Sequence, residues 1–168
     1  MTKSTKFYLL IILQIVFLLV MVGTKIFTLK TGTKILLEVV PVDPRDIFRG
    51  EYARLNYKIS TMNSPEMQKI KENQIVYVKL RQVEKYWEAV SVSKEKPILN
   101  KDEILIIGKK RWGNRIEYGI ESYFVPEGKA IEIERIRAPA KVSVEVSVDR
   151  FGNAAINRIF IDDKPMRF

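Results

Sequence analysis

The stretch "KVSVEVSVDRFGNAAINRIFID", residues 141–162, indicates most clearly which kind of fold this chain adopts. Valine alternates with serine and glutamate from Val142 to Val148, and a period of two is typical of a strand with one buried face. "RFGN" then has the composition of a turn, and "AAINRIFID" returns as a second strand. The stretch therefore predicts an antiparallel β-hairpin.

Similar patterns recur earlier in the chain. "QIVYVKLRQV" with "KYWEAVSVS" predicts one hairpin, and "EILIIGKKRW" with "RIEYGI" predicts another around Gly113-Asn114. Further strands are expected in "KILLEVVPV" (34–42) and "YARLNYKI" (52–59), where alternation places four residues on one side: Ala53, Leu55, Tyr57 and Ile59. These short strands predict a mainly β domain, an antiparallel barrel or sandwich.

Two segments have helical features. "SPEMQKIKEN" (64–73) predicts a short helix, with Ser64 as its N-cap and Pro65 at the first helical position. "PEGKAIEIERIRA" (126–138) fits either a helix or a strand, and we favour the helix. One or two short helices are therefore expected beside the strands.

The N-terminal segment is strongly apolar. The residues from Phe7 to Leu29 would span about 35 Å as a helix, enough to cross a bilayer. A cleaved signal peptide is the alternative, but no small-x-small pattern follows the apolar run. We therefore expect a single transmembrane helix (about 7–29) within an anchor of residues 1–30, a short "KTGT" linker, and a β-rich domain over residues 31–168.

Charge gives little information on orientation or on partners. Lysines flank the apolar segment on both sides, so the positive-inside rule is nearly neutral, and the N-terminal position of the segment favours an extracytoplasmic domain. The net charge is +9, but basic and acidic residues are mixed after residue 30. We expect a single-pass protein of the cell membrane that contacts the lipid bilayer and no nucleic acid.

Composition excludes several chemistries. The chain has no cysteine and no histidine, which excludes disulfides, cysteine nucleophiles, histidine-based triads and the usual zinc sites. We expect no cofactor, no metal site and no catalytic residue. One enzyme alternative is a Ser/Lys hydrolase, because "STMNSPEM" (60–67) weakly resembles the serine box of signal peptidases, with Ser60, Thr61 and Ser64 as the hydroxyls.

A dense charged stretch precedes the strand at 52–59. Six charges of balanced sign lie within twelve residues: Asp43, Arg45, Asp46, Arg49, Glu51 and Arg54. Turn residues and Gly50 favour a structural corner whose charges pair with one another. The functional alternative is a charged pocket beside Tyr52.

Three motifs resemble one known family. "DPRDIFRGEYARLNY" (43–57) resembles the defining motif of the GDYxxLxY family of membrane-anchored bacterial proteins, with Glu51 in place of aspartate. "YGIESYFVPEGKAIEIE" (118–134) and "IFIDDKP" (159–165) are also similar to its members. The resemblance implies an N-terminal anchor, a β-rich extracytoplasmic domain and association with multi-spanning membrane proteins, without a known activity.

These observations define the candidate motif or binding residues, which are Asp43, Arg45, Asp46, Arg49, Gly50, Glu51, Tyr52, Leu55, Tyr57, Tyr118, Glu121 and Tyr123. We expect a non-enzymatic accessory or interaction module whose partner is a polytopic membrane protein. A second alternative, besides the hydrolase, is a module that binds a cell-envelope polymer in a cleft near Tyr52 and Tyr123; its small-molecule ligand is open.

Overall fold

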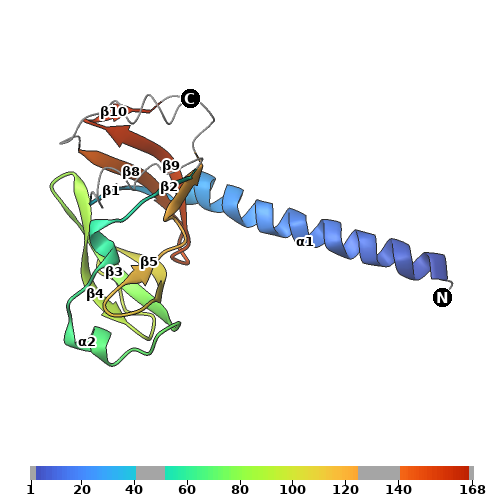
Figure 1. The fold of residues 1–168 in the computed structure, drawn as a ribbon, viewed down its shortest axis with the longest axis horizontal. Helices are drawn as coiled ribbons and strands as arrows, with labels where there is room; N and C mark the ends of the chain where they lie inside the picture. The colour runs from blue at the N-terminus through green and yellow to red at the C-terminus, as the bar shows by residue number, and fades with distance from the viewer. Residues whose placement is uncertain (1–2, 41–51, 125–140, 167–168) are drawn as a thin grey trace.

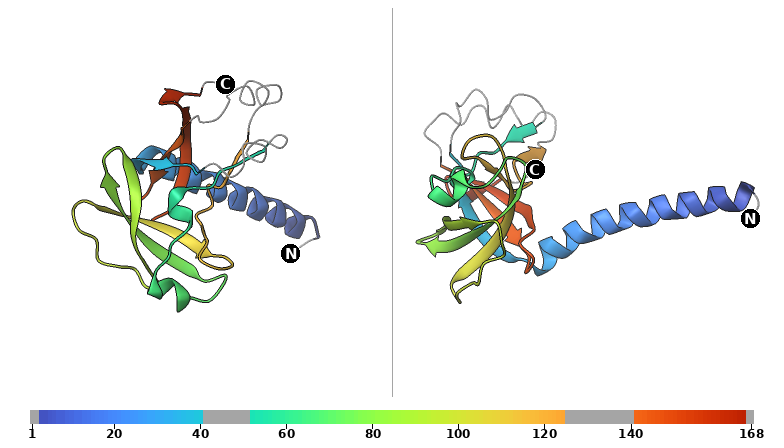
Figure 2. Two further views of the ribbon diagram at one scale, coloured as in Figure 1. Left: turned by 60° about the vertical axis from the view of Figure 1, so that its left-hand side comes forward. Right: turned by 90° about the horizontal axis from the view of Figure 1, so that it is seen from below.

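The computed structural model of the protein describes residues 3–40, 52–124 and 141–166. It is mostly β, with one long apolar helix at the N-terminus (Figure 1). This helix, α1 (Lys3–Thr31), extends away from the β domain, and the right-hand view of Figure 2 shows the same separation from below. The two other helical segments are η1 (Lys58–Ser60) and α2 (Pro65–Gln68).

The first sheet has four antiparallel strands in the order β1-β8-β9-β10. Their bounds are β1 (Thr33–Glu38), β8 (Val142–Val148), β9 (Ala154–Ile161) and β10 (Lys164–Pro165). The hairpin predicted at residues 141–162 is confirmed as β8 and β9. Ile35 lies opposite Val146 and Leu37 opposite Val144, so the buried faces of β1 and β8 coincide.

The second sheet is also antiparallel, in the order β4-β3-β5-β6. Its strands are β3 (Ile75–Val83), β4 (Tyr86–Ser93), β5 (Glu103–Lys110) and β6 (Ile116–Glu117). Both predicted hairpins are confirmed here. Gly113 has a φ of +63° between β5 and β6, a conformation that glycine adopts without a steric penalty.

A two-stranded ribbon completes the domain. It pairs β2 (Tyr52–Arg54) with β7 (Ser122–Phe124). The strand expected at 52–59 is therefore too long, because the chain turns into η1 after a single bridge between Val39 and Tyr57. The predicted alternation nevertheless holds after Arg54, since Leu55, Tyr57 and Ile59 are all buried.

One apolar core connects these elements, and the sheets around it form a mostly β fold in which one sheet is a half-barrel. The core side chains from the two four-stranded sheets include Ile35, Leu37, Val144, Val146, Val76, Val78, Leu80 and Ile106. Each fully buried aliphatic side chain contributes about 1.5–3 kcal/mol. The predicted fold class is confirmed.

Helix α2 is shorter than the expected 64–73. Ser64 has the predicted N-cap role, because its Oγ accepts a hydrogen bond from the backbone N–H of Met67 at 3.2 Å. The buried ammonium group of Lys110 then donates to the carbonyl oxygens of Met67 and Ile70, at 2.7 and 2.6 Å. Lys110 thus binds one carbonyl oxygen in the last turn of this helix and one just after it.

The expected "KTGT" linker is a second correction. Helix α1 continues through Thr31 and β1 begins at Thr33, so only Gly32 separates the helix from the sheet. The segment at 126–138, where a helix was favoured, lies outside the described residues.

Candidate functional site

The C-terminal end of α1 meets the β8–β9 hairpin in a buried polar contact between distant segments, which we call the joint. Thr28 Oγ1 donates a hydrogen bond to Asp149 Oδ2 at 2.8 Å, and both residues are buried. Asp149 begins the turn between β8 and β9, and it also accepts bonds from the backbone N–H groups of Phe151 and Asn153, at 2.9 and 3.0 Å, and from Asn153 Nδ2 at 3.0 Å. The carboxylate is therefore saturated with donors.

These contacts set the electrostatics of the joint. Burial on its own would raise the pKa of Asp149, but the hydrogen bonds from Asn153 and Thr28 outweigh it and lower this pKa. Asp149 therefore stays ionised, and its charge strengthens each of the bonds that it accepts.

Further bonds attach the helix end on both sides of Thr28. Lys25 Nζ donates to the carbonyl oxygen of Ala154 at 3.3 Å, and Ser147 Oγ donates to that of Leu29 at 3.3 Å. Gly32 N–H donates to Thr28 O at 2.9 Å, in contact with β8. The last two turns of α1 are thus fixed to the β8–β9 hairpin.

The rest of α1 makes a different surface. Thr5–Thr31 is long and apolar enough to cross a membrane, and none of its most apolar window is buried against the protein. Large apolar side chains from Phe7 to Phe27 are exposed. Length and composition fit both a membrane anchor and a signal sequence.

The described part of the family-like motif forms a structural clasp. Tyr57 donates its hydroxyl hydrogen to Ile120 O at 2.6 Å, and Tyr118 donates to Ile59 O at 2.7 Å. Each tyrosine thus binds the carbonyl two residues after the other. Burial, followed by the charge of Glu121, raises the pKa of both hydroxyl groups, so both remain donors. Leu55 is fully buried in the same core.

Glu121 orders the turn that presents this clasp. Its carboxylate accepts hydrogen bonds from the backbone N–H groups of Tyr118 and Gly119, and Gly119 has a φ of +77°. Its carbonyl oxygen accepts a bond from Leu55 N–H at 2.7 Å. Leu55, Tyr57, Tyr118 and Glu121 are therefore brought together, and their contacts are those of a brace.

Only some of the remaining candidate residues from the sequence lie within the described part of the structure. Tyr52 lies in β2 opposite Phe124 of β7, and Tyr123 is partly buried against the core, which raises the pKa of its hydroxyl. The other candidates lie outside the described residues: Asp43, Arg45, Asp46, Arg49, Gly50 and Glu51.

The hydroxyl groups considered for hydrolase chemistry are placed differently from one another. Ser60 is 1% exposed, and its Oγ has no hydrogen-bond partner among the described residues. Ser64 Oγ is occupied as the cap of α2. Thr61 forms an isolated bridge with Arg115 through the backbone. A serine nucleophile needs a base within hydrogen-bond reach, and neither serine has one among the described residues.

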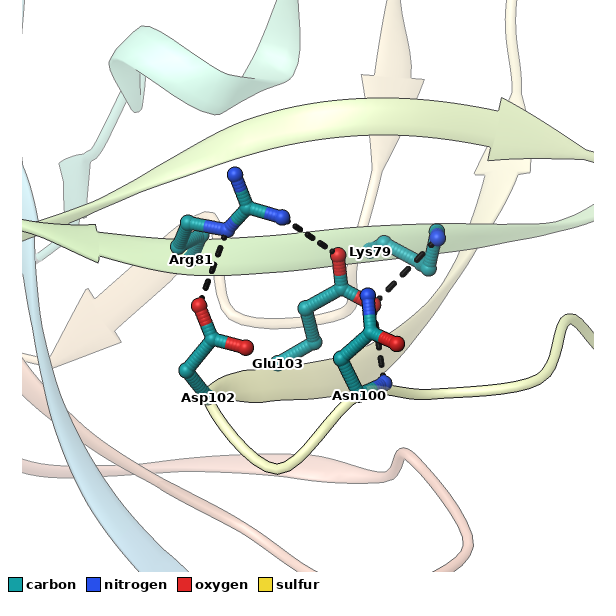
Figure 3. A network of polar contacts seen from close by, with 5 residues as sticks. All are labelled: Lys79, Arg81, Asn100, Asp102 and Glu103. Atoms are coloured by element: carbon teal, nitrogen blue, oxygen red, sulfur yellow. Dashed lines mark hydrogen bonds and ion pairs between the residues drawn. The ribbon is translucent and has the colours of Figure 1, made fainter.

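A charged network on the second sheet surrounds Glu103 (Figure 3). The buried carboxylate of Glu103 accepts hydrogen bonds from Arg81 at 2.9 Å, Asn100 N–H at 3.0 Å and Lys79 at 3.3 Å, while Asp102 pairs with Arg81 at 3.2 Å. The hydrogen bond from the Asn100 N–H, with those from Lys79 and Arg81, lowers the pKa of Glu103 to about 2. Burial acts in the opposite direction and is outweighed. The network fixes the start of β5 to β3.

One groove lies away from the motif. It has a volume of about 540 Å³ and a mixed lining that includes Trp87 and Phe160, with ion pairs Lys34–Glu145 at 3.7 Å and Lys85–Asp163 at 2.7 Å beside it. Tyr123 is not among its lining residues, so this groove differs from the cleft expected near Tyr52 and Tyr123. Its charges are paired with each other.

Sequence reasoning missed Thr28, Asp149 and Glu103. Asp149 had a signal, since "DRFGN" is a turn whose first aspartate accepts backbone hydrogen bonds. Thr28 and Glu103 had none, because their partners come from distant segments. Among the described residues, no group of three or more acidic side chains is arranged to hold a metal ion.

Comparison with known proteins identifies a family. The family model described as GDYXXLXY protein matches residues 14–159, which is most of the chain. No curated protein and no solved structure matches the chain. The chain therefore belongs to the GDYXXLXY family, and the match includes most of α1 as well as the β domain.

Proposed function

We propose that this member of the GDYXXLXY family is a single-pass membrane protein, and that its extracytoplasmic β domain is a non-enzymatic accessory module for a polytopic membrane protein. The observation that carries the proposal is the joint. A helix with an exposed apolar surface ends in a buried hydrogen bond between Thr28 and Asp149. Such a joint holds the domain in one orientation relative to whatever surrounds the helix.

The apolar surface of α1 supports an anchor. Thr5–Thr31 has 27 residues and is therefore about 40 Å long, whereas the hydrocarbon core of a bilayer is about 30 Å thick. A continuous exposed apolar surface of this size is unfavourable in water and favourable in lipid. Lys25 lies near the domain end, where its ammonium group reaches the interface.

The joint also supports retention of the helix. Helix α1 is continuous from the apolar run into the last two turns, where Lys25, Thr28 and Leu29 bind the β8–β9 hairpin. Cleavage after the apolar run would leave these docked turns without the helix that precedes them. A signal sequence has no need of such contacts.

Gln14 supports a partner within the membrane. It lies in the apolar part of α1, and its exposed amide has no hydrogen bond to another described residue. Polar side chains in bilayers form hydrogen bonds across helices, and a neighbouring helix of a polytopic protein would provide the partner.

The proposal that the module is non-enzymatic is supported by the positions of two serines. Ser60 is buried, and Ser64 caps α2.

Topology is tested first. The chain has no cysteine, so single cysteines can be introduced at the two ends by Lys6→Cys and Lys164→Cys. A membrane-impermeant maleimide added to spheroplasts should label Lys164→Cys at once and Lys6→Cys only after permeabilisation. The reverse pattern, or a mature protein that begins near Gly23, overturns the proposal.

Partner binding is tested by crosslinking in intact membranes, followed by purification in mild detergent and mass spectrometry. Gln14→Leu should lower the recovery of a multi-spanning partner several-fold. Val16→Leu is the matched control, because it lies on the opposite side of the helix and leaves Gln14 intact. Recovery of no multi-spanning protein with the unmodified chain contradicts the accessory role.

A further inference from the structure

The β8–β9 turn, residues 149–153, lies beside the domain end of α1. Asp149 binds Thr28, and the carbonyl oxygen of Ala154 binds Lys25. Thr28 and Lys25 are three and six residues before the last helical residue, which is about 4.5 and 9 Å along the helix axis. When α1 spans a bilayer, these residues lie at the membrane–water boundary, and the turn lies there with them.

The turn displays an aromatic and a basic side chain. Phe151 is 50% exposed although its ring is large and apolar, and the Arg150 guanidinium lies 4.7 Å from the centre of that ring. Phenylalanine on a surface that lies against a membrane is buried at the boundary between headgroups and acyl chains, while nearby basic side chains meet the headgroups.

The backbone of the turn is fixed by hydrogen bonds to β5 and to Asp149. Gly152 has a φ of +93°, and its carbonyl oxygen accepts a hydrogen bond from Ile107 N–H of β5 at 2.8 Å. A side chain at Gly152 would contact Ile107 at 2.9 Å. Asp149 adds its own bonds to Phe151 N–H and Asn153 N–H. The turn is therefore fixed in place, with Arg150 and Phe151 outward.

Exposed cations lie on the turn and in the last two turns of α1. Lys25, Lys30 and Arg150 are exposed cations, whereas the carboxylate of Asp149 is buried and fully bonded. Clusters of basic residues next to a membrane helix attract the anionic headgroups of lipids. The outer face of the joint thus complements an anionic membrane surface.

We propose that the β8–β9 turn is a second membrane contact, in which Phe151 enters the interfacial layer and Arg150, with Lys25 and Lys30, binds the phosphates of anionic lipids. This inference rests on the proposed function, because it requires that α1 spans the bilayer. The helix fixes the position of the domain, and the turn fixes its rotation about the helix axis. The β domain then presents one constant face to its membrane partner.

The test uses the full chain in vesicles of phosphatidylethanolamine and phosphatidylglycerol. Single cysteines at Leu13, Phe151 and Lys164 each carry an environment-sensitive fluorophore, and lipids with a quencher near the headgroup or near the chain end are added. Lys164 is the control, because it pairs with the far end of β9, about 23 Å along the strand from Ala154. Thermal unfolding of each labelled protein confirms that it is folded.

The proposal predicts strong quenching of the label in Phe151→Cys by the headgroup-proximal quencher and none of the label in Lys164→Cys. Quenching of the Leu13→Cys label without quenching at Phe151 overturns this inference and leaves the membrane anchor intact. A Leu13→Cys label that no lipid quenches overturns the proposed function itself. The two failures are therefore distinct.

The lipid charge is tested with a second variant. Arg150→Gln, combined with the label at Phe151→Cys, should reduce quenching several-fold in the anionic vesicles. Arg150→Gln should have little effect in vesicles of phosphatidylcholine alone, where we expect weaker quenching of the Phe151→Cys label even when Arg150 is present. Equal quenching in both kinds of vesicle, with and without Arg150, overturns the part assigned to anionic lipid.

Discussion

Thr28, near the C-terminal end of α1, donates a 2.8 Å hydrogen bond to Asp149 in the β8–β9 turn, so a buried contact joins residues 121 positions apart in the sequence. The acceptor is oriented in advance, because Asn153 and the backbone of the turn hold the carboxylate in place. The bond therefore adds little entropic cost when the helix docks. It links the proposed membrane anchor directly to the fold of the domain.

Loss of this bond should destabilise the joint. We expect Thr28→Val to lower the free energy of unfolding by about 1–3 kcal/mol, since it removes a hydrogen bond to a charged group. Asp149→Asn should cost at least as much, because an amide nitrogen would then face hydrogen-bond donors. Thermal unfolding of the full chain in detergent measures both. Thr31→Val is the control, because among the described residues Thr31 Oγ1 binds only Phe27 O of its own helix. An equal effect there would contradict the assignment.

Gly32 lies between α1 and β1 and packs closely against β8. A Cβ atom at this position would lie 2.5 Å from Thr28 O and 2.9 Å from Val148 N, and both are backbone atoms that the joint holds. We expect Gly32→Ala to destabilise the protein by about 1–3 kcal/mol through overpacking. Gly23→Ala, which has no atom within 4 Å of the new Cβ, should leave the unfolding temperature unchanged or raise it, because alanine favours the helix. Similar melting of the two variants would show that the helix end can move.

The tyrosine clasp gives a prediction for the family motif. Tyr57→Phe and Tyr118→Phe should each lower stability by about 1–3 kcal/mol, because each leaves a buried carbonyl oxygen without its donor. Leu55→Ala should cost about 2–5 kcal/mol as a truncation in the core. Chemical denaturation of the full chain measures these changes. Tyr77→Phe is the control, because Tyr77 is a partly buried tyrosine of β3. This change should alter the free energy of unfolding little.

The hairpins could be predicted from the sequence because their signals are local. Alternating residues and a turn lie within one stretch such as 141–162, and β8 and β9 follow it closely. The family could be recognised for a similar reason, since its motifs are contiguous. The fold class followed from the number and spacing of such stretches.

The joint could not be predicted, because its donors and acceptors come from opposite ends of the chain. "KTGT" has the composition of a linker, but Gly32 is there to allow close packing on β8 and not to provide flexibility. The ribbon β2–β7 and the clasp were missed for the same reason, since Tyr57 and Tyr118 are brought together only by the fold. The carbonyl oxygens near the end of α2 are bound by Lys110, a residue on a distant strand.

The serines considered as nucleophiles have opposite expected effects. Ser60→Ala should leave stability unchanged or raise it, because it removes a buried hydroxyl group that has no partner among the described residues. Ser64→Ala should lower stability by about 1 kcal/mol through loss of the cap on α2. Thermal unfolding and partner recovery are measured together. Loss of cellular function in Ser60→Ala, with unchanged melting and unchanged partner recovery, would favour the hydrolase alternative.

The Glu103 network gives a prediction for acid stability. The pKa of Glu103 is lowered from its usual value of 4.5 to about 2 in the folded protein. A carboxylate whose pKa is depressed by folding contributes stability that is fully present above the unfolded pKa. This contribution is lost as the pH falls from about 4.5 towards 2, because the unfolded chain takes up the proton first. The unfolding temperature of the full chain should therefore fall across this window.

Glu103→Gln removes this titration, so the variant should be less stable at neutral pH and should lose less stability between pH 4.5 and 2. Some acid dependence should remain in it, because the pKa of Asp149 is also lowered in the folded protein. Asp102→Asn is the matched control, since this neighbouring carboxylate is exposed and an exposed ion pair contributes about 0–1 kcal/mol. Parallel pH profiles for the unmodified chain and Glu103→Gln would show that the buried carboxylate does not govern acid unfolding.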